Sequence, residues 1–289
     1  MTILVTGAQG QLGREIVLAL QASGVSVIGI GRDVLDFSQT EQVAEKIAGY
    51  AADWVINCAA YTQVDRAEDE SELAFAINRD AARAVAEGVQ LSGGRLLHVS
   101  TDFVFGGKQG RPYREDDAAN PLNVYGQSKL EGEQAVCEVL PESLILRTAW
   151  VYGVHGHNFV KTILKLASER KELKVVDDQT GTPAWTRDIA LAILSLIKIK
   201  ASGIYHFTNE GVASWYDFAA EIVACAKQLG FPIMVETIVP IPSEDFQRPA
   251  QRPPYSVLSK VNMRRVLSYQ IPNWRTSLHA MVEQQSREK

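Results

Sequence analysis

Cysteine is scarce in this sequence, and its three copies, Cys58, Cys137 and Cys225, are widely spaced and form no C-x-x-C motif. This pattern predicts neither a disulfide framework nor a zinc site, and it is typical of a protein in a reducing compartment. The sequence also lacks the apolar core of a signal peptide after Met1, and it lacks any run of about 18 apolar residues that a membrane helix would need. We therefore predict a cytoplasmic protein with no membrane partner.

An excess of basic residues is also absent, because the net charge is -5 at pH 7. The broad positive surface of a general nucleic-acid binder is thereby excluded, and an anionic ligand must be bound by local groups. Charged residues make up 22% and hydrophobic residues 46% of the 289 residues, so the chain can bury one large core or two unequal cores.

A glycine-rich turn follows the first apolar segment. Thr2–Thr6 predicts a strand, Gly7, Gly10 and Gly13 form a G-x-x-G-x-x-G turn, and apolar residues at helical spacing come next. Such a turn lets the backbone approach a pyrophosphate at the N-terminus of a helix. The spacing differs from the general G-x-G-x-x-G fingerprint, so the motif alone predicts either a dinucleotide loop or a tight packing turn.

The second strand, predicted at Val25–Ile30, bears on which nicotinamide cofactor is used. Arg32 follows it, near the place where NAD-binding proteins carry an acidic residue. A guanidinium suits a 2′-phosphate, so we predict NADPH, with NADH as the alternative because Asp33 is adjacent and a surface arginine would need no ligand. We expect the next helix to open at Asp36-Phe37-Ser38, with Ser38 as its N-cap.

Further strands alternate with helices, which predicts an α/β fold with a doubly wound parallel sheet. We expect strands at 53–60, 95–100 and 144–147. Ligands of such sheets bind beyond the carboxyl ends of the strands, where Gly7, Ala60, Thr101 and 148–152 all fall. We predict a Rossmann-like domain at 1–150 plus about 186–212, and a smaller C-terminal α/β substrate domain at about 151–185 plus 213–289.

The segment from Ser100 to Lys129 carries the residues best suited to catalysis. Tyr125 and Lys129 are four residues apart in a predicted helix, so their side chains share one face. A phenol keeps its proton to about pH 10 and can act as an acid, while an adjacent ammonium stabilises the phenolate. A hydroxyl at the strand end, from Ser100 or Thr101, can hold the substrate oxygen. The pattern predicts general-acid chemistry on a carbonyl. Taken without the other motifs, the same spacing would also fit a tyrosine and a lysine that are simply exposed on a helix.

Two segments invite a metal assignment, and we predict no metal site in either. The carboxylates of 65–72 are explained by a helix N-terminus, and His155 and His157 lack a third ligand. The proline-rich loop at 240–254 holds Arg248 and Arg252, which either present a guanidinium to a phosphate or are simply exposed.

Several long motifs occur in one order along the whole chain: GAQGQLG, NCAAYTQVDRAE, STDFVFGG, PLNVYGQSKLEGE, RTAWVYG, NFVKTIL, DDQTGTPA and QRPPYSVL. With them the chain resembles the extended short-chain dehydrogenase/reductases and, more narrowly, the dTDP-4-dehydrorhamnose reductases. The resemblance implies reduction of the 4-oxo group of dTDP-4-dehydro-L-rhamnose by NAD(P)H. The product would be dTDP-L-rhamnose, a precursor of bacterial surface polysaccharide.

The resemblance also implies roles for individual residues. Tyr125 would protonate the developing alkoxide, Lys129 would bind the nicotinamide ribose, and Thr101 would hold the sugar carbonyl. The cofactor-binding set that we expect is Gly7, Gly10, Gln11, Leu12, Gly13, Arg32, Asp36, Phe37, Ala59, Ala60, Tyr61, Tyr125 and Lys129. The substrate-binding set is Thr62, Val64, Thr101, Asp102, Tyr125, Trp150, Asn158 and Arg252, the last two on the diphosphate side.

Related activities remain alternatives. Sugar-nucleotide dehydratases carry Asp-Glu after the catalytic threonine, whereas here Asp102 is followed by Phe103, which argues against dehydration. Another nucleotide-sugar 4-ketoreductase, an epimerase, or a non-catalytic NADP-binding regulatory subunit like that of methionine adenosyltransferase stays open. The resemblance further implies that Mg²⁺ can bind at a subunit contact of a homodimer, with Glu15 taking part, but no complete ligand set is evident.

Overall fold

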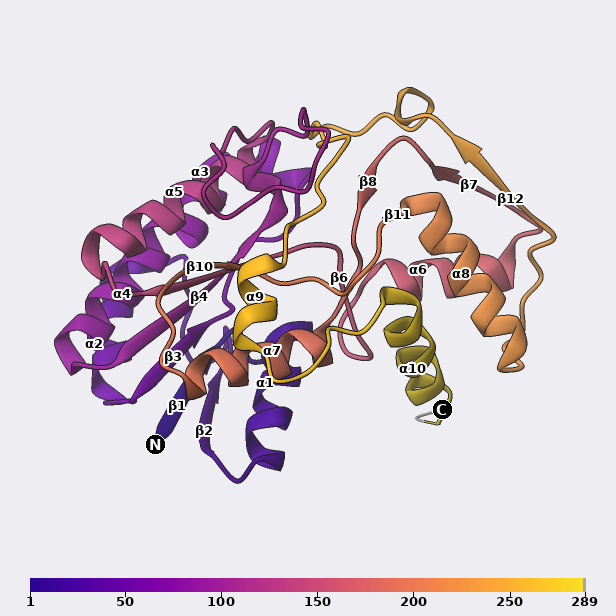
Figure 1. Ribbon diagram of the computed structural model, residues 1–289. Helices are drawn as coiled ribbons and strands as arrows, with labels where there is room; N and C mark the ends of the chain where they lie inside the picture. The colour runs from indigo at the N-terminus through magenta and orange to yellow at the C-terminus, as the bar shows by residue number, and fades with distance from the viewer. Residues whose placement is uncertain (288–289) are drawn as a thin grey trace.

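A sheet of six parallel strands forms the centre of the larger part of the protein (Figure 1). The computed structural model describes residues 1–287. The strand order is β10-β5-β4-β3-β1-β2, and every neighbouring pair is parallel. The strands are β1 (Thr2–Thr6), β2 (Ser26–Ile30), β3 (Trp54–Asn57), β4 (Arg95–Thr101), β5 (Leu144–Thr148) and β10 (Gly203–His206). The predicted doubly wound parallel sheet is confirmed.

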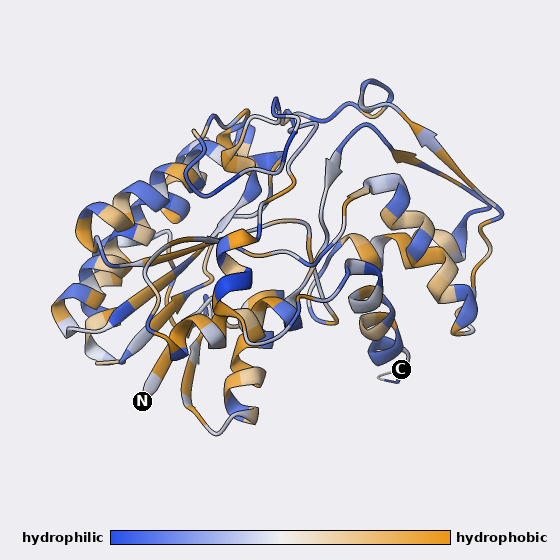
Figure 2. Cartoon of the chain, in the orientation of Figure 1, coloured by the Kyte–Doolittle hydropathy of each residue, from blue (hydrophilic) through white to orange (hydrophobic). Residues whose placement is uncertain are grey.

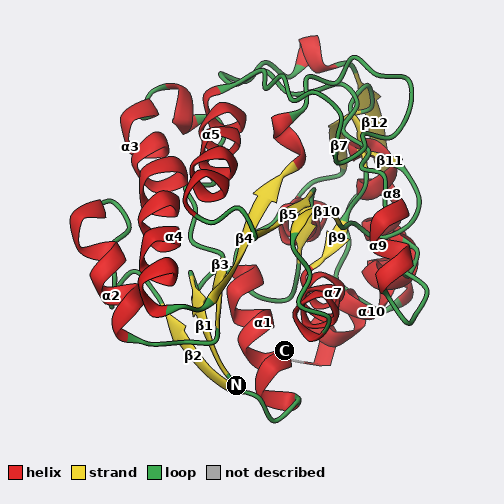
Figure 3. Ribbon diagram, turned by 60° about the vertical axis from the view of Figure 1, so that its left-hand side comes forward, coloured by secondary structure: helices red, strands yellow, loops and turns green. Residues whose placement is uncertain are grey.

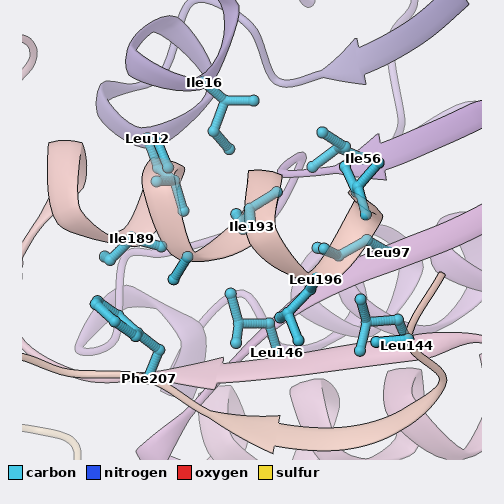
Figure 4. Close-up of a cluster of buried hydrophobic side chains, with 14 of the residues drawn as sticks. Leu12, Ile16, Ile56, Leu97, Leu144, Leu146, Ile189, Ile193, Leu196 and Phe207 are labelled. Atoms are coloured by element: carbon cyan, nitrogen blue, oxygen red, sulfur yellow. The ribbon is translucent and has the colours of Figure 1, made fainter. Parts of the chain in front are cut away.

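Helices cover both faces of this sheet (Figure 3). On one side lie α1 (Gln11–Ala22) and α7 (Thr186–Lys198), and on the other lie α2 (Val43–Gly49), α4 (Ala81–Ser92) and α5 (Val124–Val139). The strands are largely apolar because both of their faces are covered, whereas the helices alternate apolar and polar residues (Figure 2). Figure 4 shows the face of the sheet that α1 and α7 cover. There Leu12, Ile16, Ile189, Ile193 and Leu196 of the helices pack against Ile56, Leu97, Leu144 and Leu146 of the strands.

The strand order changes direction at β1, and this creates the crevice that the site uses. The chain passes from β1 to β2 on one side and then crosses to β3 on the other side of β1. The loops that follow β1 and β3 therefore continue in opposite directions along the sheet, which leaves a crevice between them at the carboxyl ends of these strands. In open α/β sheets ligands bind in this crevice.

A second hydrophobic core lies to the right in Figure 1. Its helices are α6 (Phe159–Glu169), α8 (Trp215–Gln228) and α10 (Trp274–Arg287), and β7 (Glu172–Val176) pairs in parallel with β12 (Thr237–Ile241). Short strand pairs join the two parts, namely β6 (Val151–Tyr152) with β9 (Ala184–Trp185) and β8 (Thr180–Gly181) with β11 (Ala213–Ser214). After β12 the chain returns to the larger part along the top of Figure 1 and reaches α9 (Val261–Val266).

The prediction that a helix opens at Asp36 to Ser38 is wrong. Helix α2 starts at Val43, after a 3₁₀ turn at Thr40–Gln42. Asp36 Oδ1 instead accepts hydrogen bonds from the Ser38 backbone N–H at 3.0 Å and from its hydroxyl at 2.8 Å. Aspartate commonly binds the backbone two residues later in this way, and such a local turn competes with a helix start.

None of the helices between residues 1 and 287 is both long and apolar enough to cross a membrane.

Candidate active site

The loop after β1 is held against the loop after β3 by close backbone packing. Gly7 has a φ of +61°, and a Cβ at this position would lie 2.8 Å from backbone atoms of Cys58 and Ala59. A Cβ at Gly13 would collide with the Gly7 carbonyl, so α1 begins directly beside the loop. The first N–H groups of α1 have no acceptor within the helix and carry a partial positive charge. This cradle fits the pyrophosphate of a dinucleotide.

Opposite charges meet at the end of β2. The Arg32 side chain is 77% exposed, and its Nη2 lies 3.6 Å from Asp36 Oδ2. Hydrogen bonds from Ser38, and to a lesser extent the charge of Arg32, lower the pKa of Asp36. The nearby Asp33 accepts a hydrogen bond from Gln9 Nε2 at 2.7 Å. Arg32 is therefore an exposed cation at the edge of the loop, and Asp36 is its ion-pair partner.

Thr101 and Tyr125 come together at the carboxyl end of β4. Thr101 is the last residue of this strand, and its hydroxyl lies within hydrogen-bonding reach of the Tyr125 phenol in the first turn of α5. The same hydroxyl accepts from the Phe103 N–H at 3.2 Å and donates to Asp102 Oδ1 at 3.1 Å. Burial raises the pKa of Tyr125 to about 12. The phenol is therefore protonated at neutral pH and available as an acid.

Lys129 is buried one helical turn after Tyr125, with 2% of its surface exposed. Its ammonium Nζ donates to the Val99 carbonyl at 2.7 Å and lies 3.4 Å from His98 Nε2. Burial lowers the pKa of Lys129 to about 8, although the charge of Glu133 opposes this shift. The side chain is cationic at neutral pH and loses its charge in mildly alkaline solution.

The start of α5 is fixed by its own N-cap residue and by contacts with two other segments. Asn123 is the N-cap, because its Oδ1 accepts from the Gly126 N–H at 2.7 Å. Its Nδ2 donates to the Gln251 carbonyl at 2.7 Å, and Glu68 Oε1 accepts from the Val124 N–H at 3.0 Å. The bonds to the Val124 and Gly126 N–H groups satisfy donors that have no partner within the helix, and they fix where the helix that carries Tyr125 begins.

Asn78 connects the loop after β3 to α5. The side chain is 1% exposed, its Oδ1 accepts from the Tyr61 N–H at 2.9 Å, and its Nδ2 donates to Ser128 Oγ at 2.9 Å. A buried amide needs such partners, and here they join the cofactor-side loop to the helix that carries Tyr125 and Lys129.

Two tryptophans form the wall that faces the second core. Trp150 has a φ of +46°, which is rare for a bulky residue and is typically found at functional sites. Its ring stacks on Trp215 with the centroids 3.5 Å apart, and a Cβ at Gly181 would collide with the Trp150 indole. Asp102 lines the same cleft as Trp150, and burial raises the pKa of its carboxyl group to about 6.

The loop after β12 carries Arg252 into the site. Its Nη1 and Nη2 each donate to Asp65 at 2.9 Å, and Arg248 Nη1 lies 3.6 Å from the same carboxylate. Asp65 also accepts from the Ala250 N–H at 3.4 Å, and Arg252 lowers the pKa of Asp65. One carboxylate thus anchors the returning loop by three of its residues.

Many of these groups line one cleft with a volume of about 980 Å³. The predicted residues found there are Gly7, Gly10, Gln11, Leu12, Gly13, Arg32, Asp36, Phe37, Ala59, Ala60, Tyr61, Thr62, Val64, Thr101, Asp102, Tyr125, Lys129, Trp150 and Arg252. Asn158 is not among the residues that line the cleft, although its Nδ2 lies 3.4 Å from Oε1 of Gln11, which does line it. Asn158 is the N-cap of α6, accepting from the Lys161 N–H at 3.2 Å, and its Nδ2 donates to the Gly153 carbonyl at 2.8 Å. Its polar groups are therefore used within the fold.

Within residues 1–287, no group of three or more His, Cys, Asp or Glu side chains is arranged to hold a metal ion.

A family model supplies the identification. The model described as the RmlD substrate binding domain matches residues 1–287. The chain belongs to this family. The dTDP-4-dehydrorhamnose reductase of Burkholderia thailandensis is 41% identical over 286 residues, which cover 95% of this chain and 96% of that protein. The resemblance predicted from the motifs is therefore confirmed.

Solved structures of family members agree with this membership. A dTDP-4-dehydrorhamnose reductase from Clostridium acetobutylicum is 40% identical, has a TM-score of 0.92, and is matched over 99% of this chain and 100% of that chain. The enzyme from Bacillus anthracis, solved in complex with NADP, is 37% identical with a TM-score of 0.92 over 98% of this chain and 99% of that chain. This chain is accordingly an oxidoreductase that uses a nicotinamide cofactor.

Sequence reasoning missed several residues of the cleft. Trp215 comes from the second core, and its helical pattern gave no sign that the ring would meet Trp150. Arg66 and Glu70 form an ion pair beside Tyr61, whose hydroxyl donates to Glu70 Oε2 at 2.5 Å. Their spacing of four residues was a usable signal, but the surrounding carboxylates suggested only a helix N-terminus.

Proposed function

We propose that the protein reduces the 4-keto group of dTDP-4-dehydro-L-rhamnose with NADPH to give dTDP-L-rhamnose, a step of dTDP-rhamnose biosynthesis. The observation that carries this proposal is the meeting of Thr101, Tyr125 and Lys129 in the same cleft as the glycine loop. The names of the relatives support the choice of sugar nucleotide. Two separate hydrophobic cores support the proposed division into a cofactor domain and a substrate domain.

The side chains account for the proton part of the reaction. When bound, the cofactor supplies a hydride to C4 of the sugar. The Thr101 hydroxyl turns its single proton from Asp102 to the carbonyl oxygen, and the O–H bond of Tyr125 breaks as its proton moves to the same oxygen. The phenolate that remains is stabilised by the Lys129 ammonium one turn away. Cofactor binding at the glycine loop and at Lys129 orients the two reactants.

Phe103 supports reduction over dehydration. Its ring packs edge-on against Tyr125, with the centroids 5.6 Å apart. Where the dehydratases carry a second carboxylic acid, this protein therefore has an apolar ring, Phe103, that packs against the tyrosine. Of the Asp-Glu pair that serves elimination of water in the dehydratases, only Asp102 is present, so one of the two acid–base groups is missing.

We propose that Arg252 binds the diphosphate of the substrate. Replacing Arg252 with Ala should raise KM for the dTDP-sugar about 10- to 100-fold with little change in kcat, because a charge-assisted hydrogen bond to the substrate is lost. Steady-state kinetics measure this. Arg248→Ala is the matched control, since Arg248 contacts the same Asp65 but does not line the cleft. Equal effects of both variants would place Arg252 in loop anchoring only.

We also propose that Arg32 selects NADPH. Arg32→Ala should weaken NADPH binding about 10- to 100-fold and leave NADH binding nearly unchanged, because only NADPH carries the 2′-phosphate. Titration of protein fluorescence with each cofactor gives both dissociation constants. An equal loss for the two cofactors would show that Arg32 does not contact the phosphate.

The direct test follows NADPH absorbance with purified protein and enzymatically generated dTDP-4-dehydro-L-rhamnose. Oxidation that depends on the sugar supports the reductase. NADPH that binds but is never consumed would favour the regulatory-subunit alternative. The same proposal includes a cytoplasmic location, which the three free cysteines support. It also includes a homodimer, which light scattering would test.

A further inference from the structure

A row of polar side chains runs beneath the cleft to the catalytic lysine. Thr6 of β1, Asn57 of β3 and His98 of β4 are register partners in adjacent parallel strands. Thr6 Oγ1 and Asn57 Oδ1 are 2.6 Å apart, Asn57 Nδ2 and His98 Nδ1 are 3.1 Å apart, and His98 Nε2 is 3.4 Å from Lys129 Nζ. All four residues are at most 2% exposed. The row was not anticipated from the sequence.

The number of N–H donors on Lys129 and on His98 decides which atom donates in each hydrogen bond of this row. An ammonium has three donors and no acceptor, so the imidazole nitrogen that faces Lys129 must offer a lone pair. Burial and the charge of Lys129 lower the pKa of His98 well below its usual range, so the ring is neutral. The single ring proton is then on Nδ1. Of the three Lys129 donors, one goes to Val99, one to His98, and the third is left for the cleft that the side chain lines.

Asn57 has to match this tautomer. An Nδ1–H needs an acceptor, so the Asn57 amide is turned by 180° relative to the atom positions given above, which brings its oxygen to His98 and its nitrogen to Thr6. The oxygen and nitrogen of an amide have nearly the same shape, and a hydroxyl can accept as well as donate. The Ala59 N–H lies 3.3 Å from Thr6 Oγ1 and also 3.3 Å from the Asn57 amide atom that faces Thr6, so in this arrangement it donates to Thr6 Oγ1 alone.

We propose that His98 is a positioning residue for Lys129: as the Nδ1–H tautomer, oriented by Asn57, it accepts a hydrogen bond from the ammonium and directs the remaining N–H into the cleft. This inference rests on the proposed function, in which Lys129 serves the reduction. The titratable groups that interact with Lys129 are Cys58 after β3, His98 in β4 and Glu133 in α5, and Tyr125 lines the same cleft one helical turn before it. Among these, His98 supplies a neutral acceptor in direct contact.

The first test does not depend on activity. The five histidines are labelled with ¹⁵N, and the His98 signals are assigned by their loss in His98→Gln. We expect protonated Nδ1 and unprotonated Nε2, with no titration of the ring near pH 6.5, because burial and the charge of Lys129 lower its pKa well below that value. An Nε2–H tautomer, or a ring that titrates near pH 6.5, would overturn the proposal.

The second test compares pH profiles of kcat. His98→Leu removes the acceptor, destabilises the ammonium and lowers the pKa of Lys129, so the alkaline limb near pH 8 should move down by about one unit, a tenfold loss of kcat above the limb. His98→Gln keeps an acceptor and should keep the limb. His206→Leu is the control, because His206 is equally buried but contacts the Tyr113 carbonyl at 3.2 Å.

The outcomes separate the two proposals. A limb that stays in place in His98→Leu, or that moves equally in His206→Leu, contradicts the positioning role. If the wild-type protein never oxidises NADPH with the dTDP-sugar, the proposed function fails. The NMR result on the wild-type protein then still decides the state of His98, and it does so even if the leucine variant does not fold.

Discussion

Replacing Tyr125 with Phe should lower kcat by about 10² to 10⁴, the usual contribution of a positioned acid. The phenol is the one group in this account that gives a proton to the sugar oxygen, and phenylalanine removes only its hydroxyl. The ring keeps its edge-on contact with Phe103, so the fold and the cleft are preserved. NADPH binding, measured by fluorescence titration, should change little while turnover collapses.

A matched control for this experiment is Tyr113→Phe. Tyr113 is 3% exposed and stacks on Phe105 with the centroids 4.2 Å apart, but it does not line the cleft. Loss of its hydroxyl should leave kcat unchanged. If Tyr125→Phe retained most of its activity, or if both variants lost it equally, Tyr125 would not be the acid.

Replacing Glu133 with Ala should reduce the free energy of unfolding by about 3–5 kcal/mol, because removal of one partner leaves a buried charge without compensation. Glu133 lies in α5 and Arg147 in β5, and their side chains are 4% and 5% exposed. Arg147 donates to Glu133 through Nε at 2.9 Å and through Nη2 at 2.7 Å. This pair connects α5 to β5. Urea denaturation, followed by circular dichroism, measures the loss.

Glu131→Ala is the control for the buried pair. Glu131 lies two residues earlier in the same helix and pairs with Arg79 at 3.1 Å, but these side chains are 29% and 40% exposed. Solvent screening limits such a pair to about 1 kcal/mol or less. Equal losses in the two variants would indicate that the helix, and not the buried charge, determines the effect.

The parallel sheet and most of the cleft could be predicted because their causes are local. Apolar runs that end in glycine or hydroxyl residues mark strand ends, and parallel strands bring all of these ends to one edge. Gly7, Ala60 and Thr101 meet there although they are far apart in sequence. The spacing of Tyr125 and Lys129 places them on one helix face for the same kind of local reason.

The remaining features depend on contacts between distant segments. Trp215 and Arg252 reach the cleft only through the packing of the second core and the course of the loop after β12. Asparagine is a residue type that often binds ligands, but the side chain of Asn158 caps the N-terminus of α6. The row from Thr6 to His98 requires the strand register, which the apolar pattern of the strands does not reveal.

The most direct test of the account supplies NADPH deuterated at C4 of the nicotinamide, in separate reactions for each face, together with dTDP-4-dehydro-L-rhamnose. Mass spectrometry and NMR then locate the deuterium in the product. The account predicts one deuterium, transferred from one face only, at C4 of dTDP-L-rhamnose. A product without deuterium, or with deuterium at another carbon, would contradict hydride transfer to the carbonyl held by Thr101 and Tyr125.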